Sequence, residues 1–463
     1  MGNPPDAGRR RLMNIKRAKE EIKHTIDAYH LRGADGKYRI PVIRQRPVLL
    51  MGPPGIGKTQ IMEQVAEECG LPLLSYTITH HTRQSAIGLP FIREKEYQGK
   101  MHSVTEYTMS EIISAVYEKM EETGQQEGIL FIDEINCVSE TLAPTMLQFL
   151  QCKTFGNQQV PEGWIIVAAG NPPEYNKSVR EFDIATLDRV KKIEIEADYQ
   201  VWKEFAYEQK IHGAIISYLD IKPDNFYQIE TTVDGKRFVT ARGWQDLSEI
   251  LQVYEALDIP VDQEVVGQYL QHGRIAKDFA AYLDLYAKYK TDYQIDGILK
   301  GVWKPSAIEK LKFAAFDERL SVVGLLISRL GEIFSQVQAV DEQVTAVYEQ
   351  LKAKKALEGE LDEAIRADFE AQVSRREQMV EEAAENLECA FDFCETAFGE
   401  GQELVVFVTE LTINPYSSWF ISENGCDRYY KYNKGLLFRE GRQGILDDMD
   451  ALRDRMERRE GGQ

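Results

Sequence analysis

The chain contains 463 residues, of which 43% are hydrophobic. One hydrophobic core rarely serves a chain of that length, so we expect about two to four domains in a folded protein. The 75 acidic residues outnumber the 55 lysines and arginines and give a net charge of −20, which argues against nucleic acid as the main partner because a phosphate backbone requires a basic surface.

The cysteines and the apolar runs indicate the cellular compartment of the protein. The six cysteines form no CxxC pair and have no cluster of histidines beside them, which fits a reducing compartment and argues against a zinc site. The sequence shows no run of eighteen apolar residues and no signal-peptide hydrophobic segment. We therefore expect a cytoplasmic protein without membrane insertion.

The first 46 residues precede the first strong motif. Residues 1–12 are rich in proline, glycine and arginine, and their composition predicts disorder. An amphipathic pattern predicts a helix over residues 13–31, and residues 33–46 read as a connecting loop. An α/β core follows, from residue 47 to residue 197.

A short apolar strand at residues 48–51 runs into the segment GPPGIGKT at residues 52–59. Its glycines let the backbone adopt conformations that are closed to residues with a Cβ, so that successive N–H groups converge on an anion. Lys58 would reach the β- and γ-phosphates of a nucleotide, and Thr59 would bind Mg²⁺ at the start of a helix. The predicted nucleotide-binding residues of this loop are Gly52, Pro53, Pro54, Gly55, Ile56, Gly57, Lys58, Thr59 and Gln60.

Two hairpins are predicted beyond this loop. After a second strand at residues 71–76, the stretch from 90 to 108 alternates in character around Tyr97-Gln98-Gly99-Lys100, which is typical of a β-hairpin. Residues 155–163 read as a second, shorter hairpin turn. In a ring of subunits, such hairpins would line the central pore.

A buried strand at residues 129–132 ends in two carboxylates, and a further strand at residues 164–169 ends near an amide. Buried strands carry acids at their ends when these face a cleft, and phosphoryl-transfer sites use them to hold the metal and to activate water. We predict that Asp133 holds Mg²⁺ together with Thr59 and that Glu134 is the general base. Asn171 would orient the attacking water through a hydrogen bond.

These three strand ends, in this order, resemble the Walker A, Walker B and sensor 1 motifs of AAA+ ATPases. The resemblance implies ATP and Mg²⁺ as cofactors. Residues 184–189 look like the arginine-finger segment of that family, in which Arg189 would reach the γ-phosphate held by a neighbouring subunit; Arg180 is the competing candidate. Residues 240–244 resemble sensor 2, which implies that Arg242 contacts the nucleotide.

Within AAA+ proteins, the details are most similar to the MoxR group over about residues 45–290. The similarity rests on the Walker A sequence, on DEIN at 133–136, on GNPP at 170–173 and on the Leu-Asp-Arg segment. It also rests on two insertions, which contain the predicted hairpins at 90–108 and 155–163. One departure is that Val190 and two lysines follow the Leu-Asp-Arg segment, where the group commonly has phenylalanine or a similar apolar residue. The resemblance implies a hexameric ring that activates a client protein, assembles it or inserts its cofactor, often with a partner that carries a von Willebrand factor A domain.

The remaining chain reads as helical. Residues 198–300 are expected to form a helical lid with a short hairpin at 227–238, and residues 301–463 a helical C-terminal region whose last helix covers 445–458. Apolar residues at spacings of three and four predict an antiparallel, coiled-coil-like hairpin over 330–398. They are Ile333, Val337, Val340, Val344, Val347 and Leu351, followed by Val380, Ala384, Leu387, Phe391, Cys394 and Phe398.

This helical hairpin permits two interpretations. In the first, its apolar seams only pack against each other and the lid; in the second, the hairpin projects as an arm that docks a partner. Residues 404–411 and the aromatic-rich residues 416–432 could cover the hairpin or form part of an interface.

The predicted fold class is thus α/β, with an AAA+ parallel-sheet core and a helical lid, followed by an all-α C-terminal region. The predicted function is ATP hydrolysis that drives conformational work on a protein client. One alternative is a nucleic-acid-directed motor or restriction-type NTPase, which would require a basic pore. Another is a nucleotide-gated scaffold with little turnover. The preference for ATP over GTP comes from the resemblance alone.

Overall fold

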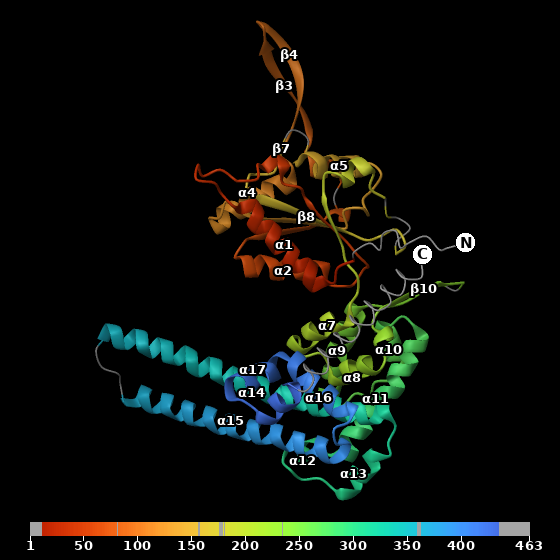
Figure 1. Ribbon diagram of the computed structural model, residues 1–463. Coiled ribbons are helices and arrows are strands. Elements are labelled where there is room, and N and C mark those ends of the chain that lie inside the picture. Colours follow the sequence, from red (N-terminus) through yellow and green to blue (C-terminus); the bar gives the residue numbers. More distant parts are fainter. Residues whose placement is uncertain are drawn as a thin grey trace, which may run out of the picture. The chain divides into compact units, whose positions relative to one another are not determined.

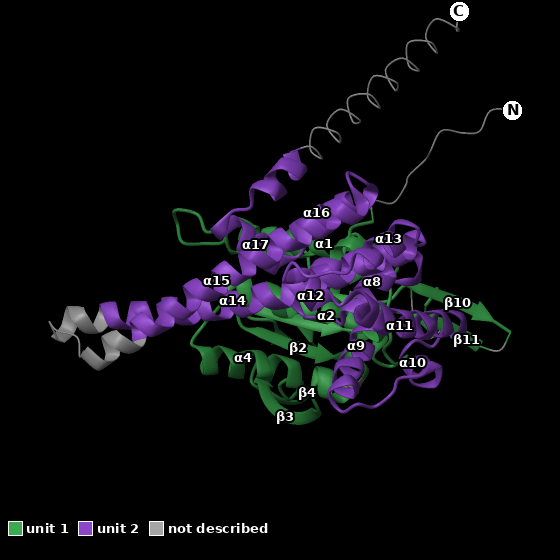
Figure 2. Cartoon of the chain, turned by 90° about the horizontal axis from the view of Figure 1, so that it is seen from below, with its two compact units in different colours: residues 1–201, 227–243 green, residues 202–226, 244–463 purple. Residues whose placement is uncertain are grey.

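The structure is a computed structural model that describes residues 12–80, 82–155, 158–175, 179, 181–233, 235–358 and 363–434. Contacts divide the chain into two compact units, shown in green and purple in Figure 2. Unit 1 comprises residues 1–201 and 227–243, and unit 2 comprises residues 202–226 and 244–463. The predictions of disorder for residues 1–12 and of a final helix at 445–458 lie outside the described residues, apart from residue 12.

Unit 1 is built on a five-stranded parallel sheet. Its strands are β1 (Val48–Met51), β2 (Leu73–Thr77), β5 (Gly128–Asp133), β8 (Trp164–Gly170) and β9 (Lys191–Glu194). They lie in the order β2-β5-β8-β1-β9, with Met51 beside Gly170 on one side and beside Glu194 on the other. The predicted α/β fold class is therefore confirmed, and the three strand ends singled out above meet at one edge of the sheet.

Helices cover both faces of this sheet, as Figure 1 shows. They are α1 (Ile15–His30), α2 (Lys58–Cys69), α3 (Arg83–Ile87), α4 (Glu111–Thr123), α5 (Ala143–Cys152) and α6 (Ile184–Leu187). Successive strand residues point to opposite faces, so Val48 and Leu50 belong to the core under α1 and α2, whereas Leu49 and Met51 belong to the core under α4 and α5. Both faces being covered explains why β1 is entirely apolar.

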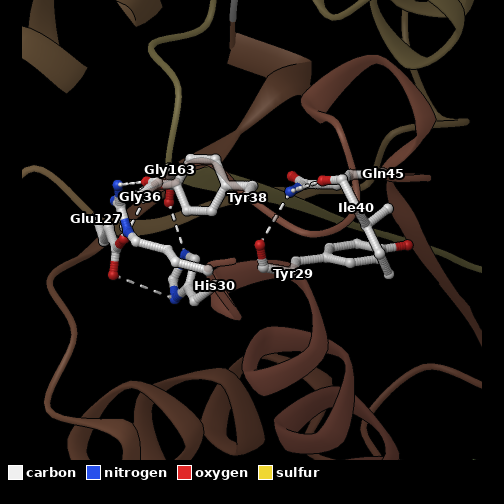
Figure 3. Close-up of polar contacts among 9 residues, drawn as sticks. Tyr29, His30, Gly36, Tyr38, Ile40, Gln45, Glu127 and Gly163 are labelled. Atoms are coloured by element: carbon white, nitrogen blue, oxygen red, sulfur yellow. Dashed lines mark hydrogen bonds and ion pairs between the residues drawn. The ribbon is translucent and has the colours of Figure 1, made fainter. Parts of the chain in front are cut away.

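Polar contacts hold the loop after α1 against the amino ends of two central strands (Figure 3). Tyr38 donates a hydrogen bond to Glu127 at 2.9 Å, and His30 Nε2 lies 2.9 Å from the carbonyl oxygen of Gly163. Glu127 directly precedes β5 and Gly163 directly precedes β8. The side-chain amide of Gln45 donates to the backbone carbonyls of Tyr29 and Ile40, each at 3.0 Å. These contacts lie at the edge of the sheet opposite the strand ends that carry the motifs.

All three predicted hairpins are present in unit 1. The first is β3 (Pro90–Tyr97) with β4 (Lys100–Tyr107), joined at Gln98 and Gly99, both of which have positive φ as a tight hairpin turn requires. The second is short, β6 (Thr154–Phe155) with β7 (Gln158–Gln159), and the third is β10 (Gln228–Thr232) with β11 (Gly235–Val239). Residues 156, 157 and 234, at the turns of the last two, lie outside the described residues.

Unit 2 contains, besides the helical residues 427–434, most or all of the helices α7 to α17. They are α7 (Tyr199–Glu208), α8 (Gly213–Ile221), α9 (Ala241–Ala256), α10 (Gln263–Tyr269), α11 (Gly273–Tyr293), α12 (Ile295–Leu299), α13 (Pro305–Lys312), α14 (Phe316–Glu358), α15 (Glu363–Phe398), α16 (Gln402–Ile413) and α17 (Pro415–Asn424). A single turn of 3-10 helix occurs in unit 2 at Pro223–Asn225, and two more occur in unit 1 at Val42–Arg44 and Ile78–His80.

The predicted helical hairpin is formed by α14 and α15 (Figure 1). Its seam is buried in the half nearest the rest of unit 2, where Val337 and Leu387 are each 1% exposed, and Asp341 pairs with Arg376 at 2.7 Å further out. Helices α16 and α17 cover this half: Phe420 stacks on α14, and Phe407 contacts α15 edge to face. Of the two roles considered for residues 404–432, covering the hairpin is therefore confirmed.

Helix α14 is also the one described helix that is long and apolar enough to cross a membrane. Over Phe316–Lys352, its most apolar stretch has a mean hydropathy of 1.4, and 56% of that stretch is buried inside the protein. A core helix has the same properties, and the packing of α16 and α17 on α14 agrees with that role.

Unit 2 also buries a charged cluster, whose removal we expect to be costly. Lys203, 1% exposed, pairs with Asp220 at 2.5 Å and with Glu410 at 2.6 Å, and Tyr207 donates to Glu410 at 2.7 Å. Lys203→Met leaves the carboxylates without their cation and should lower the free energy of unfolding by about 3–5 kcal/mol, measured by urea denaturation.

A matched control for this change is Lys222→Met. Lys222 pairs with Asp278 at 2.6 Å, but both side chains are about two-fifths exposed. Exposed pairs contribute only about 0–1 kcal/mol, so the control should lose little stability. Equal losses in the two variants would contradict the importance of the buried cluster.

Candidate nucleotide-binding site

The loop between β1 and α2 has the backbone geometry of a phosphate-binding turn. Gly55 and Gly57 have φ of 73° and 89°, in the left-handed region that favours glycine. Helix α2 begins at Lys58, so its free N–H groups and positive dipole end face the loop. Gly52 differs from the prediction, because its φ is not positive. A Cβ at this position would lie 3.0 Å from the Ile195 carbonyl oxygen, so a larger side chain would crowd that backbone.

Lys58 lies buried at the centre of the site. Its ammonium donates to the carbonyl oxygens of Gly52 at 2.8 Å and Pro53 at 2.9 Å, and to Asn171 Oδ1 at 2.8 Å. Burial lowers the pKa of Lys58 to about 8, although the nearby Asp133 carboxylate acts in the opposite direction. The structure thus brings the cation of the loop and the predicted water-orienting amide into direct contact.

The predicted metal ligands also lie together. Thr59 donates its hydroxyl proton to Asp133 Oδ2 at 2.8 Å, from the first turn of α2 to the end of β5. A hydroxyl and a carboxylate side by side are oxygen ligands of the kind that Mg²⁺ accepts while keeping several of its waters. The residues present therefore fit the cation, and their role as ligands stays a prediction.

Glu134 is held in a restrained conformation beside Asp133. Its φ of 57° is unusual for a residue with a side chain, and its backbone N–H donates to Asp133 Oδ1 at 2.8 Å. The Glu134 carboxylate accepts a hydrogen bond of 3.1 Å from the hydroxyl of Thr79, which follows β2. Sequence analysis missed Thr79; its position just after a strand that neighbours β5 is the signal that could have indicated it.

Asn136 is a second residue that sequence analysis did not assign. It is 3% exposed, and it donates to the Asn171 carbonyl oxygen at 2.8 Å while accepting from the Asn171 N–H at 3.3 Å. A Cβ at Gly170 would lie only 2.6 Å from Asn136 Oδ1, so this contact requires the glycine. The amide pair fixes the backbone of Asn171 and leaves its side chain for Lys58.

The segment predicted as sensor 2 touches the phosphate-binding loop. The backbone N–H of Arg242, in the first turn of α9, donates to the Gly55 carbonyl oxygen at 3.2 Å. The Tyr227 hydroxyl donates to the Pro54 carbonyl oxygen at 2.8 Å, and Thr240 packs against Gly55. The charge of Arg242 is close enough to disfavour protonation of Lys58. Arg242 thus lies beside the phosphate-binding loop, and its contact with the nucleotide stays a prediction.

Arg189 is not part of this cluster among the described residues. It is exposed, and it donates to Gln151 Oε1 at 2.9 Å. It lies two residues before Lys191, which pairs with Val48 at the amino ends of the strands. The site lies at the carboxyl ends of the same strands. Val48 and Met51 are three residues apart, which corresponds to about 10 Å along a strand. Arg180, the competing candidate, is outside the described residues.

The pKa of Lys58 predicts how nucleotide affinity depends on pH. A bound phosphate stabilises the charged ammonium and raises its pKa above the value of about 8 in the free protein, so binding takes up a proton above pH 8. ATP affinity should therefore change little just below that pH and fall about tenfold per pH unit above it, as measured by nucleotide titration. Lys58→Arg keeps its charge throughout this range, and an unchanged slope in that variant would contradict the assignment.

Comparison with known proteins agrees with this geometry for part of the chain. Residues 48–193 match the family described as "ATPase family associated with various cellular activities (AAA)". No curated protein matches the chain. The matched region begins at β1 and ends within β9, so it contains four whole strands of the sheet and most of the fifth. It also contains all of the site except Tyr227, Thr240 and Arg242.

Proposed function

We propose that this chain, which carries an AAA ATPase domain at residues 48–193, is a ring-forming ATPase of the MoxR type that remodels a client protein. The observation that carries the proposal is the convergence of Lys58, Thr59, Asp133, Glu134 and Asn171 at one edge of the sheet. These residues supply a cation that binds the phosphates, two metal ligands, a base and a water-orienting amide. Hydrolysis of a nucleoside triphosphate requires these groups.

In the proposed reaction, the loop N–H groups and Lys58 bind the β- and γ-phosphates. To reach them, the Lys58 ammonium leaves the carbonyl oxygens of Gly52 and Pro53. Glu134 accepts the proton of a water molecule held by Asn171, and the water oxygen attacks the γ-phosphorus. The bond between the γ-phosphorus and the bridging oxygen breaks, which releases phosphate and ADP. Mg²⁺ neutralises charge on the phosphates when it is bound.

The ring is supported by the position of Arg189. This exposed arginine lies at the amino ends of the strands, too far from the site of its own chain, yet it is available to the site of a neighbour. An arginine supplied in trans stabilises charge on the transferred phosphoryl group. Hydrolysis would then require an assembly, which we propose to be a hexamer.

The MoxR assignment rests on sequence, and the insertions agree with it. The β3–β4 hairpin stands between β2 and β5, where the resemblance led us to expect an insertion. A net charge of −20 favours a protein client over nucleic acid. We therefore propose that the protein acts in the cytoplasm on a protein client, together with a partner that has a von Willebrand factor A domain.

The test is a pull-down from the native cell with the Glu134→Gln variant, with and without ATP. This variant should bind ATP without hydrolysing it, so that client complexes accumulate. A protein enriched only with ATP, together with a von Willebrand factor A domain protein, would support the proposal. Enrichment of nucleic acid would favour the motor, and enrichment that does not depend on ATP would contradict remodelling.

A further inference from the structure

The β3–β4 hairpin has two faces of opposite charge. Directly paired residues of an antiparallel hairpin point to the same face, and the faces alternate along each strand. One face, here called the basic face, carries Arg93, Lys95, Lys100 and Glu106. The other, here called the acidic face, carries Glu94 and Glu96.

The charges of the two faces are equal and opposite. On the basic face, Glu106 is paired with Arg93 at 3.4 Å and also with Lys95, so three cations and one carboxylate leave a net charge of +2. The acidic face has two carboxylates and no basic side chain, which gives −2. Its Glu94 and Glu96 are exposed.

Both faces also expose apolar side chains. On the acidic face, Ile92 is 77% exposed and Met101 61%; on the basic face, Tyr97 is 52% exposed and Phe91 42%. The hairpin projects beyond the helices of unit 1 (Figure 1), and within the described residues its two strands pair only with each other. An isolated two-stranded hairpin is marginally stable in water, so a surface that covers it would stabilise it.

We propose that the acidic face of each hairpin packs on the basic face of the next copy of this chain. The inference rests on the proposed ring, because a ring closes through a contact between two different surfaces of each subunit. One hairpin provides both surfaces, with matching length, opposite charge and apolar side chains on each. An acidic peptide bound to the basic face would leave Glu94, Glu96, Ile92 and Met101 uncovered.

Two charge-reversal variants of the full chain test this contact. Glu94→Lys with Glu96→Lys makes both faces +2, and Lys95→Glu with Lys100→Glu makes both faces −2. Each variant alone should then need about tenfold more protein for half-assembly with ATP at about 0.05 M salt, and the difference should shrink at about 1 M salt. Sedimentation velocity measures the assembly.

The decisive measurement is an equimolar mixture of the two variants. Every face of one variant is then opposite in charge to every face of the other, so an alternating ring should assemble at the wild-type concentration. If each variant is defective and the mixture is not restored, or if each variant assembles as well as wild type, the hairpin contact is wrong. If the wild-type chain itself stays monomeric with ATP, the proposed ring is wrong.

Two controls separate this contact from general effects. Glu381→Lys with Glu385→Lys makes the same change of charge on exposed positions of α15, and it should leave assembly unchanged. Circular dichroism and ATP binding of each monomeric variant should match the wild type. If the Lys95→Glu, Lys100→Glu variant fails these checks, it is replaced by Lys100→Glu alone, which removes no ion pair that the structure shows. The defect of this replacement should be rescued by the Glu94→Lys, Glu96→Lys variant.

Discussion

Arg189→Ala is expected to lower ATP turnover about 10³–10⁵-fold while leaving ATP binding intact. Arg189 makes no contact with the site of its own chain among the described residues, so its loss should not disturb the loop around Lys58. The expected defect is loss of a charge that stabilises the transition state on a neighbouring subunit. Steady-state phosphate release and equilibrium binding of ATP measure the two effects separately.

Mixing shows whether this arginine acts between subunits. A Lys58→Ala subunit lacks a working pocket but keeps Arg189, whereas an Arg189→Ala subunit keeps its pocket. A mixture therefore contains interfaces with both an intact pocket and an intact arginine, and part of the activity should return. Arg44→Ala, at another exposed arginine of unit 1, should remain active. Unchanged turnover of Arg189→Ala, or no rescue on mixing, would contradict the trans role.

Glu134→Gln is expected to lower turnover about 10²–10⁴-fold, because an amide cannot accept the proton of the attacking water. ATP affinity should stay near that of the wild type, since Lys58 and Thr59 are unchanged. The glutamine oxygen can still accept the hydrogen bond from Thr79, so the side chain should keep its place. Single-turnover hydrolysis distinguishes this loss from slow release of product.

A matched change is Glu67→Gln, on an exposed position of α2 away from the strand ends. It removes the same charge and should leave turnover unaltered. Turnover of Glu134→Gln equal to that of the control would show that another group accepts the proton. Loss of ATP binding in Glu134→Gln would instead indicate that Glu134 holds the metal.

Local sequence determined the elements of this protein and the kinds of side chain at its site. The loop from Gly52 to Thr59 combines glycines, a lysine and a threonine within eight residues, so its chemistry is set by neighbours in the chain. The hairpins at 90–107 and 228–239 follow from alternation and turn residues, which are equally local. Periodicity likewise predicted the long helical pair of α14 and α15.

The partners of those side chains were decided only by the tertiary structure. Asn136 meets Asn171 because β5 and β8 are adjacent in the sheet, and Thr79 meets Glu134 because β2 lies beside β5. The same strand order places Arg189 at the far end of the sheet from Lys58. A single hydrogen bond between residues 35 or 55 positions apart leaves no periodic pattern in the sequence, since its geometry depends on which strands become neighbours.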